Sequence, residues 1–406
     1  MKTIGITKIE IGSCIKSAIA VAAMFLGRFS AQSQVTLDTL LVKVQTNNLS
    51  LQAARKALDA HKAEGRIGLL PNNPKVSMGY MPGNSSSIGT KEVFSITQSF
   101  DFPTNYLYKS GIAKSNDAVA EAAFREQVQS LLVETANLYY KIVAANRQSL
   151  ILERRISNAK QISESFQIRL QKGEGNILDF NKAKLQLTAL TAKQNEVLAT
   201  REQLREQLRN LNGSVPVEVT DTTFETKPLS SFEDLSTALA ANNPTIAAHQ
   251  SAEMMARKQL SLSRAQWLPE FEIGYEMEKT LGDKFAGVRV GMSIPLWQNK
   301  GAVKHANFAY KQRQSETHDA TAMAVSRLQQ DWQKAQSLQA SIASFESDLA
   351  SQQTNELLHK SLLAGGISVI QYFQETSWLY EMEETLTNMQ LEYAQLTATI
   401  TIRTRL

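Results

Sequence analysis

The feature that most constrains the fold is a proline-free stretch of 69 residues, from Thr104 to Lys172. Apolar or small side chains recur along it every seven residues, at Phe124, Leu131, Leu138, Ala145, Leu152, Ala159 and Phe166. A second series lies between them, at Val128, Ile142, Ile156 and Leu170, interrupted by Thr135, Ser149 and Ser163. This heptad pattern predicts one helix packed lengthwise against others. At 1.5 Å per residue the helix would be about 100 Å long, far longer than a compact domain requires.

Residues 1–31 have the parts of a secretory signal: a basic start, an apolar core from Ala18 to Gly27, and a small-residue exit near Ala31 or Ser33. Ten apolar residues are too few to span a bilayer, so we expect cleavage rather than a membrane anchor. The single cysteine, Cys14, precedes the apolar core, a position that disfavours lipid attachment. The mature chain would then contain no cysteine and no disulfide.

The overall charge does not favour binding to nucleic acid. Loss of residues 1–31 removes four positive charges and one negative charge, which lowers the net charge from +4 to +1. The remaining composition, 43% hydrophobic and 20% charged, is that of a folded protein. After the signal no apolar run is long enough for a transmembrane helix.

The elements occur twice, about 192–195 residues apart, and Asn242-Asn243-Pro244 echoes Asn47-Asn48-Leu49. The first repeat, residues 32–229, is predicted to contain a helix from Thr36 to about Leu70, a hairpin at 75–102, a long helix at 104–172, a turn, a helix at 177–212 and a Val/Thr-rich connector with room for a short strand. The second repeat, residues 230–406, is predicted to contain a helix, a hairpin at 270–294, a long helix at 298–364, a turn and a helix at 368–404. The predicted fold class is mainly α with a small β part.

Both hairpins alternate apolar and polar residues, which predicts strands with one apolar face. A sheet lying on a core is the ordinary interpretation of such alternation. Here no apolar element is left over to cover the hairpins, and strands of roughly 8–11 residues match outer-membrane β-strands. Four strands cannot close a barrel, so several chains would have to combine their strands.

Charged and aromatic residues around the second hairpin fit this interpretation. One strand face carries Glu270, Glu272, Glu276 and Glu278, with Arg289 on the neighbouring strand; these side chains cost little if they face a water-filled pore lumen. Aromatic residues flank both hairpins at Tyr106, Tyr108, Trp267 and Trp297, where they would lie at the membrane interface. Ordinary helix packing is the alternative for these aromatic residues.

Several segments together resemble the TolC-type outer-membrane efflux family over nearly the whole mature chain. They are the tandem repeat, the hairpin ends Ser99-Phe100-Asp101-Phe102-Pro103 and Gly291-Met292-Ser293-Ile294-Pro295-Leu296, and the turns that begin at Gly173 and Gly365. The resemblance implies a homotrimer with a twelve-stranded β-barrel in the outer membrane and an α-barrel that crosses the periplasm. It also implies two partners, a periplasmic adaptor and an inner-membrane pump of the RND type. The chain's small size is similar to the CzcC-like heavy-metal branch.

The resemblance further implies that the two turns contact the adaptor, through Gly173, Glu174, Gly175, Asp179, Gly365 and Gly366. The duct constriction would lie at Gln371, Gln374 and Glu375. Here the chain departs from the family, whose pattern has aspartates at the positions of Gln371 and Gln374 and a basic residue near Ile367. The resemblance therefore does not carry an acidic constriction ring over to this chain.

No pattern of catalytic or cofactor-binding residues occurs, and the five histidines lack the spacing of metal ligands. The sequence therefore predicts a passive exit duct for drugs, metal ions or other small solutes, with no enzymatic activity and no cofactor or bound metal. Two alternatives remain: a structural periplasmic coiled-coil or adhesin-like protein without a pore, and a periplasmic metal-binding or enzymatic protein.

Overall fold

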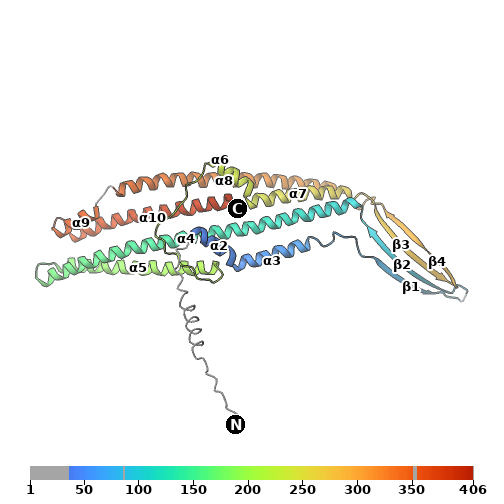
Figure 1. Cartoon of the computed structure of the whole chain (residues 1–406), viewed down its shortest axis with the longest axis horizontal. Coiled ribbons are helices and arrows are strands. Elements are labelled where there is room, and N and C mark those ends of the chain that lie inside the picture. Colours follow the sequence, from blue (N-terminus) through green and yellow to red (C-terminus); the bar gives the residue numbers. More distant parts are fainter. Residues whose placement is uncertain (1–35, 86, 351–353, 406) are drawn as a thin grey trace, which may run out of the picture.

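The computed structural model describes residues 36–85, 87–350 and 354–405, and it consists of long helices with a small β-sheet at one end (Figure 1). The mainly α fold class is thereby confirmed. The helices are α2 (Leu37–Asn47), α3 (Leu49–Glu64), α4 (Pro103–Gln171), α5 (Ile177–Leu211), α6 (Phe232–Asn242), α7 (Pro244–Ala265), α8 (Ala302–Ala350), α9 (Thr354–Leu363) and α10 (Val369–Arg405). The strands are β1 (Lys75–Pro82), β2 (Thr90–Phe100), β3 (Glu270–Thr280) and β4 (Asp283–Ser293). The expected signal peptide, residues 1–31, lies outside the described residues.

Helix α4 is the predicted 69-residue helix, and its heptad positions face its neighbours. Leu138, Ala145, Leu152 and Ala159 are buried. The polar residues that interrupt the second series, Thr135, Ser149 and Ser163, are buried as well. The Ser149 hydroxyl accepts a hydrogen bond from Gln194 on α5 at 2.8 Å, and the Thr135 hydroxyl donates to the Leu131 carbonyl at 2.8 Å. Because these hydroxyls find partners, the packing seam continues through them.

The helices that line α4 come in shorter pieces. Helix α5 packs along the C-terminal part of α4, whereas α3 and α7 pack along its N-terminal part (Figure 1). The prediction of a single helix from Thr36 to about Leu70 is wrong. Asn48 has an extended backbone, and it ends α2 and caps α3 by accepting a hydrogen bond from the Leu51 amide. A break between two helices leaves the first amides of the second helix without helical partners. The Asn48 side chain satisfies one of these amides at the start of α3.

The sequence allowed a short strand in the connector between the repeats, but residues 212–231 contain no strand. Its backbone carbonyls bond to side chains of α4 instead of to another strand. Asn146 donates to the carbonyls of Val219 and Asp221 at 2.9 and 3.1 Å, and the Tyr140 hydroxyl donates to the Glu225 carbonyl at 3.0 Å. The connector is thereby held across the middle of α4.

The second long helix starts later than the expected residue 298. Residues 298–301 form a turn in which Gly301 has a positive φ of 85°, and α8 begins at Ala302. A left-handed residue cannot continue into a right-handed helix, which explains the delayed start. The structure describes the expected helix 298–364 as α8 and α9, with residues 351–353 outside the described set.

The four strands form one antiparallel sheet in the order β1-β2-β3-β4. The two hairpins occur where the alternation places them, and they pair with each other through β2 and β3. The sheet lies at one end of the helices, and both helix turns, α4–α5 and α9–α10, lie at the opposite end (Figure 1). Strands β1 and β4 are the unpaired edges of the sheet in a single chain.

Candidate functional site

The strand register sorts the sheet into an apolar face and a mostly polar face, because residues paired across an antiparallel sheet point to the same side. Val76 pairs with Ile96, Ile96 with Tyr275, and Tyr275 with Val288. The other apolar members of this face are Met78, Tyr80, Phe94, Phe100, Phe271, Ile273, Met277, Ala286, Val290 and Met292. Gln98 also lies on this face, and Glu92, Lys279 and Lys284 lie on it toward the hairpin turns. From Phe271 to Met277 the apolar rows extend about 20 Å along the strand. That is close to the ~25 Å apolar band of outer-membrane barrels.

The opposite face carries the four glutamates predicted to line a pore. Glu270, Glu272, Glu276 and Glu278 alternate along β3 with the apolar residues. The register partners of the first three are small or polar, namely Ser293, Ser99, Gly291, Ser95 and Gly287, whereas Glu278 pairs with Val93 and Phe285 near the hairpin turns. Glu276 lies 3.5 Å from the Arg289 guanidinium, and Glu278 lies 2.8 Å from the Lys91 ammonium. Because both ion pairs are partly exposed, each contributes little to the free energy of folding. The face can therefore be hydrated and keeps a surplus of carboxylates.

The aromatic residues predicted at the membrane interface all lie where the helices meet the sheet. Trp297 is 76% exposed and Trp267 42% exposed, in the links that flank the β3–β4 hairpin. Tyr106 and Tyr108 lie in the first turns of α4 and are half-buried. The Tyr106 hydroxyl accepts a hydrogen bond from the Asp101 amide at 3.0 Å, so Tyr106 also has a packing role.

The two helix turns at the far end share one backbone design. In the first, the amides of Gly173 and Glu174 donate to the carbonyls of Leu170 and Arg169. In the second, the amides of Gly365 and Gly366 donate to the carbonyls of Leu362 and Ser361. Gly173 and Gly365 have φ of 75° and 76°, so both turns are Schellman motifs that need glycine at this position. Asp179 is half-buried in the first turn of α5, where its charge suits the helix N-terminus.

Gln371 has a partner that the sequence interpretation did not anticipate. Its side-chain oxygen accepts from the Ser368 amide at 3.0 Å, while the Ser368 hydroxyl accepts from the Gln371 amide at 3.2 Å. This reciprocal pair is a capping box at the start of α10. Gln374 and Glu375 are exposed one turn further along.

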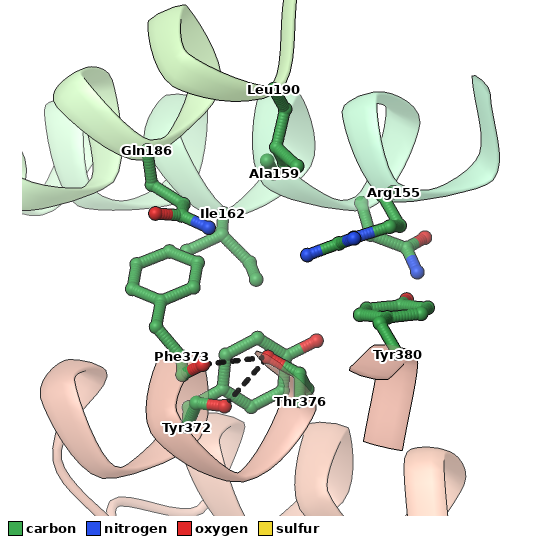
Figure 2. A pocket seen from close by; sticks show the side chains of 10 residues that line it. Arg155, Ala159, Ile162, Gln186, Leu190, Tyr372, Phe373, Thr376 and Tyr380 are labelled. Atoms are coloured by element: carbon green, nitrogen blue, oxygen red, sulfur yellow. Dashed lines mark hydrogen bonds between the residues drawn. The ribbon is translucent and has the colours of Figure 1, made fainter. Parts of the chain in front are cut away.

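A polar cluster between α4, α5 and α10 was missed from the sequence (Figure 2). The Arg155 guanidinium lies 4.0 Å from the centre of the Tyr380 ring, at one side of a small, partly open pocket whose lining includes Tyr372, Phe373 and Gln186. Burial lowers the pKa of Arg155, and burial raises the pKa of the nearby Glu383 carboxyl. Arg155 occupies no heptad core position, so the periodicity contained no signal for it. The cluster joins α10 to α4.

Within residues 36–85, 87–350 and 354–405, no group of three or more His, Cys, Asp or Glu side chains is placed to hold a metal ion. No helix in that part of the chain is both long enough and apolar enough to cross a membrane.

Comparison with known proteins gives a family match for part of the chain and a fold for nearly all of it. Residues 40–214 match the model of the outer membrane efflux protein family. The chain is similar to the crystal structure of CusC, solved in a study of conformational changes that accompany folding and transmembrane channel formation, with 19% identity, a TM-score of 0.77 and 92% of each chain covered. It is also similar to the Campylobacter jejuni CmeC outer membrane channel, with 16% identity, a TM-score of 0.69 and 91% and 85% of the two chains covered.

The outer membrane protein VceC from Vibrio cholerae is a third similar structure, with 16% identity, a TM-score of 0.69 and 91% and 94% of the two chains covered. No curated protein sequence matches the chain. At these identities the solved structures establish the fold, which extends over both repeats, whereas the family match covers mainly the first.

Proposed function

Because residues 40–214 match the outer membrane efflux protein family, we propose that the chain belongs to this family and forms the outer-membrane exit duct of a tripartite efflux system. The observation that carries this proposal is the two-faced sheet. It has a mostly apolar face whose apolar rows extend about 20 Å along the strands, and an opposite face with four glutamates. A sheet with these two faces suits lipid on one side and water on the other.

Assembly follows from the open edges of the sheet. β1 and β4 each carry a row of backbone donors and acceptors that no other strand among the described residues pairs with. Open edges are not tolerated in hydrocarbon, so β4 of one subunit would pair with β1 of the next. Three chains would supply twelve strands, and we propose a homotrimer in the outer membrane with the helices extending into the periplasm. Export would use a cleaved signal in residues 1–31.

The helix turns are the proposed contact with a periplasmic adaptor, which in turn meets an inner-membrane pump of the RND type. Beside the first turn, Ile177 and Leu178 are more than half exposed, and Ile370 is 42% exposed at the start of α10. Exposed apolar residues at a helix end suit a protein partner. Gly173, Glu174, Gly175, Asp179, Gly365 and Gly366 hold or flank these residues.

The proposed constriction needs one refinement. Gln371 is engaged in the capping box, so Gln374 and Glu375 are the better candidates to narrow the entrance. The duct itself would be passive, with drugs, metal ions or other small solutes chosen by the pump.

Bilayer recordings on the purified full chain test this function. We expect heat-modifiable trimers in the outer-membrane fraction and stable conductance with a preference for cations. Changing Glu270, Glu272, Glu276 and Glu278 together to Gln should reduce that preference at unchanged trimer yield, because the pore mouth loses its carboxylates. Glu202→Gln, an exposed change on α5, serves as the control. Trimers without conductance would exclude the duct, and absence from the outer membrane would favour a periplasmic coiled-coil scaffold.

A further inference from the structure

The four links between helices and sheet are tied together at one level of the molecule. Residues 65–74 lead into β1, 101–102 lead from β2 into α4, 266–269 lead from α7 into β3, and 294–301 lead from β4 into α8. The strand register places all four links at the same end of the sheet, since Phe100 pairs with Phe271 and Glu270 pairs with Ser293.

Direct contacts tie each link to an adjacent strand or to another link. The Gln98 side chain donates to the Asn72 carbonyl at 2.5 Å, which ties the first link to β2. The rings of Phe102 and Phe271 lie 6.2 Å apart, which ties the second link to β3. The Asn299 side chain donates to the Gln266 carbonyl at 2.5 Å, which ties the fourth link to the third. The four links therefore form a continuous arc, here called the collar.

The collar exposes large apolar side chains to solvent in the described part of the single chain. Ile67 and Leu70 are 80% and 81% exposed, and Leu296 is 68% exposed. Leu107, one turn into α4, is also largely exposed, as is Trp297. Links between helices and strands are normally polar. A band of exposed apolar residues at one level therefore indicates a surface that is covered by a partner or by lipid rather than by water.

Basic side chains lie next to these apolar residues in the chain. Arg66 directly precedes Ile67, and Lys300 and Lys304 follow Trp297; all three side chains are exposed. Exposed apolar side chains interleaved with Lys and Arg are typical of surfaces that lie in the headgroup region of a membrane, where the cations meet lipid phosphates.

We propose that the collar seats the protein in the periplasmic leaflet and gathers anionic phospholipid headgroups around Arg66, Lys300 and Lys304. This inference rests on the proposed function, because it requires the sheet to lie in the outer membrane. Continuity with the sheet supports lipid as the occupant, since the apolar row Phe100–Phe271–Met292 borders the collar directly. The helix side of the sheet faces the periplasm in that arrangement, which selects the phospholipid leaflet.

Quenching of tryptophan fluorescence by brominated lipids tests the proposal on the full-length trimer in vesicles. The reporter variant keeps Trp297 and carries Trp267→Phe, Trp332→Phe and Trp378→Phe; the matched control keeps only Trp378, near the helix turns. Lipids brominated near the headgroup should quench Trp297 at least about twofold more than lipids brominated near the chain ends. Trp378 should not respond to either. If substitution of Trp332 disturbs folding, the difference between wild type and Trp297→Phe supplies the same measurement.

The anionic preference has its own readout. A small fraction of brominated phosphatidylglycerol in phosphatidylcholine should quench Trp297 about fivefold more than the same fraction of brominated phosphatidylcholine. Arg66→Gln, Lys300→Gln and Lys304→Gln together should bring that ratio close to one with the trimer intact.

Two outcomes overturn the inference. An inserted, conducting trimer whose Trp297 is not quenched shows that the collar contacts protein. Equal quenching by the two lipid classes rejects the anionic preference. Failure to insert or conduct would instead reject the proposed function itself, together with this inference.

Discussion

The two half-chains repeat one series of elements, but they close their equivalent helix joints differently. In the first half Asn48 caps α3 and also donates to the Leu211 carbonyl at the end of α5, at 2.9 Å. Asn47 donates to the Asn212 side chain at 3.1 Å. In the second half Asn243 caps α7, while Asn242 donates to the Thr404 carbonyl near the end of α10, at 3.0 Å.

The difference shows where the chain is most tightly constrained. At the first joint the backbone turns back through Gly213, whose φ is 64°, and a Cβ built there would lie 2.3 Å from the Asn47 carbonyl oxygen. The same region receives the connector, which bonds to Tyr139, Tyr140 and Asn146 of α4. The first half thus contains the more tightly packed of the two helix joints. The second half reaches a similar arrangement with fewer close contacts among the described residues.

The largest expected effect comes from Gly213→Ala. The left-handed backbone and the clash with the Asn47 carbonyl together should lower the free energy of unfolding by about 3 kcal/mol or more. Gly301→Ala is the matched control, because Gly301 has a positive φ of 85° but open space around a built Cβ. It should cost about 1 to 2 kcal/mol. Urea unfolding followed by circular dichroism measures both, and equal costs would contradict the special role of the first joint.

Removal of the two caps should come next in size. Asn48→Ala loses a cap and a side-chain bond to α5 and should cost about 2 kcal/mol. Asn243→Ala loses the cap and should cost about 1 kcal/mol. The difference between the two urea midpoints measures the interhelical bond; a larger loss in the second half would reverse the comparison.

The smallest effect is expected at the helix turns, and it should be local. A Cβ on Gly175 would lie 2.7 Å from the Leu170 backbone nitrogen, whereas one on Gly366 would lie 3.5 Å from the nearest atom, the Ser361 carbonyl oxygen. Gly175→Ala should therefore distort the first turn and reduce efflux severalfold in cells with trimer yield unchanged. Gly366→Ala should leave efflux near wild type. Loss of the trimer in Gly175→Ala would show that this glycine acts in folding or assembly and not in the contact with the adaptor.

Much of the architecture could be predicted because it depends on period and on local stop signals. A seven-residue repeat without proline admits only a long packed helix, and α4 is that helix. Alternation along Phe271–Met277 predicted a strand with one apolar face, which the register confirms. The helix break at Asn48 was missed because the apolar pattern continues across it, and only the end of α5 gives that asparagine its second partner.

The site was less accessible to sequence reasoning. The resemblance placed Gln371 at a constriction, but its side chain caps α10, and this depends on the rotamers of Ser368 and Gln371 rather than on their spacing alone. Arg155 and Tyr380 are 225 positions apart and meet only because α10 packs on α4. The collar was also hidden, since its exposed apolar residues are scattered through segments far apart in the chain.

By itself the sequence determined the long helix α4, the two hairpins, the glycine turns and the repetition of the whole series, because periodicity and left-handed glycine positions are local properties of a chain. The tertiary structure decided how the hairpins join into one sheet, where the connector crosses α4, and which polar side chains close the joints at Asn48 and Asn243. These outcomes depend on contacts between residues far apart in the chain, which are fixed only when the helices pack and bury their polar groups together.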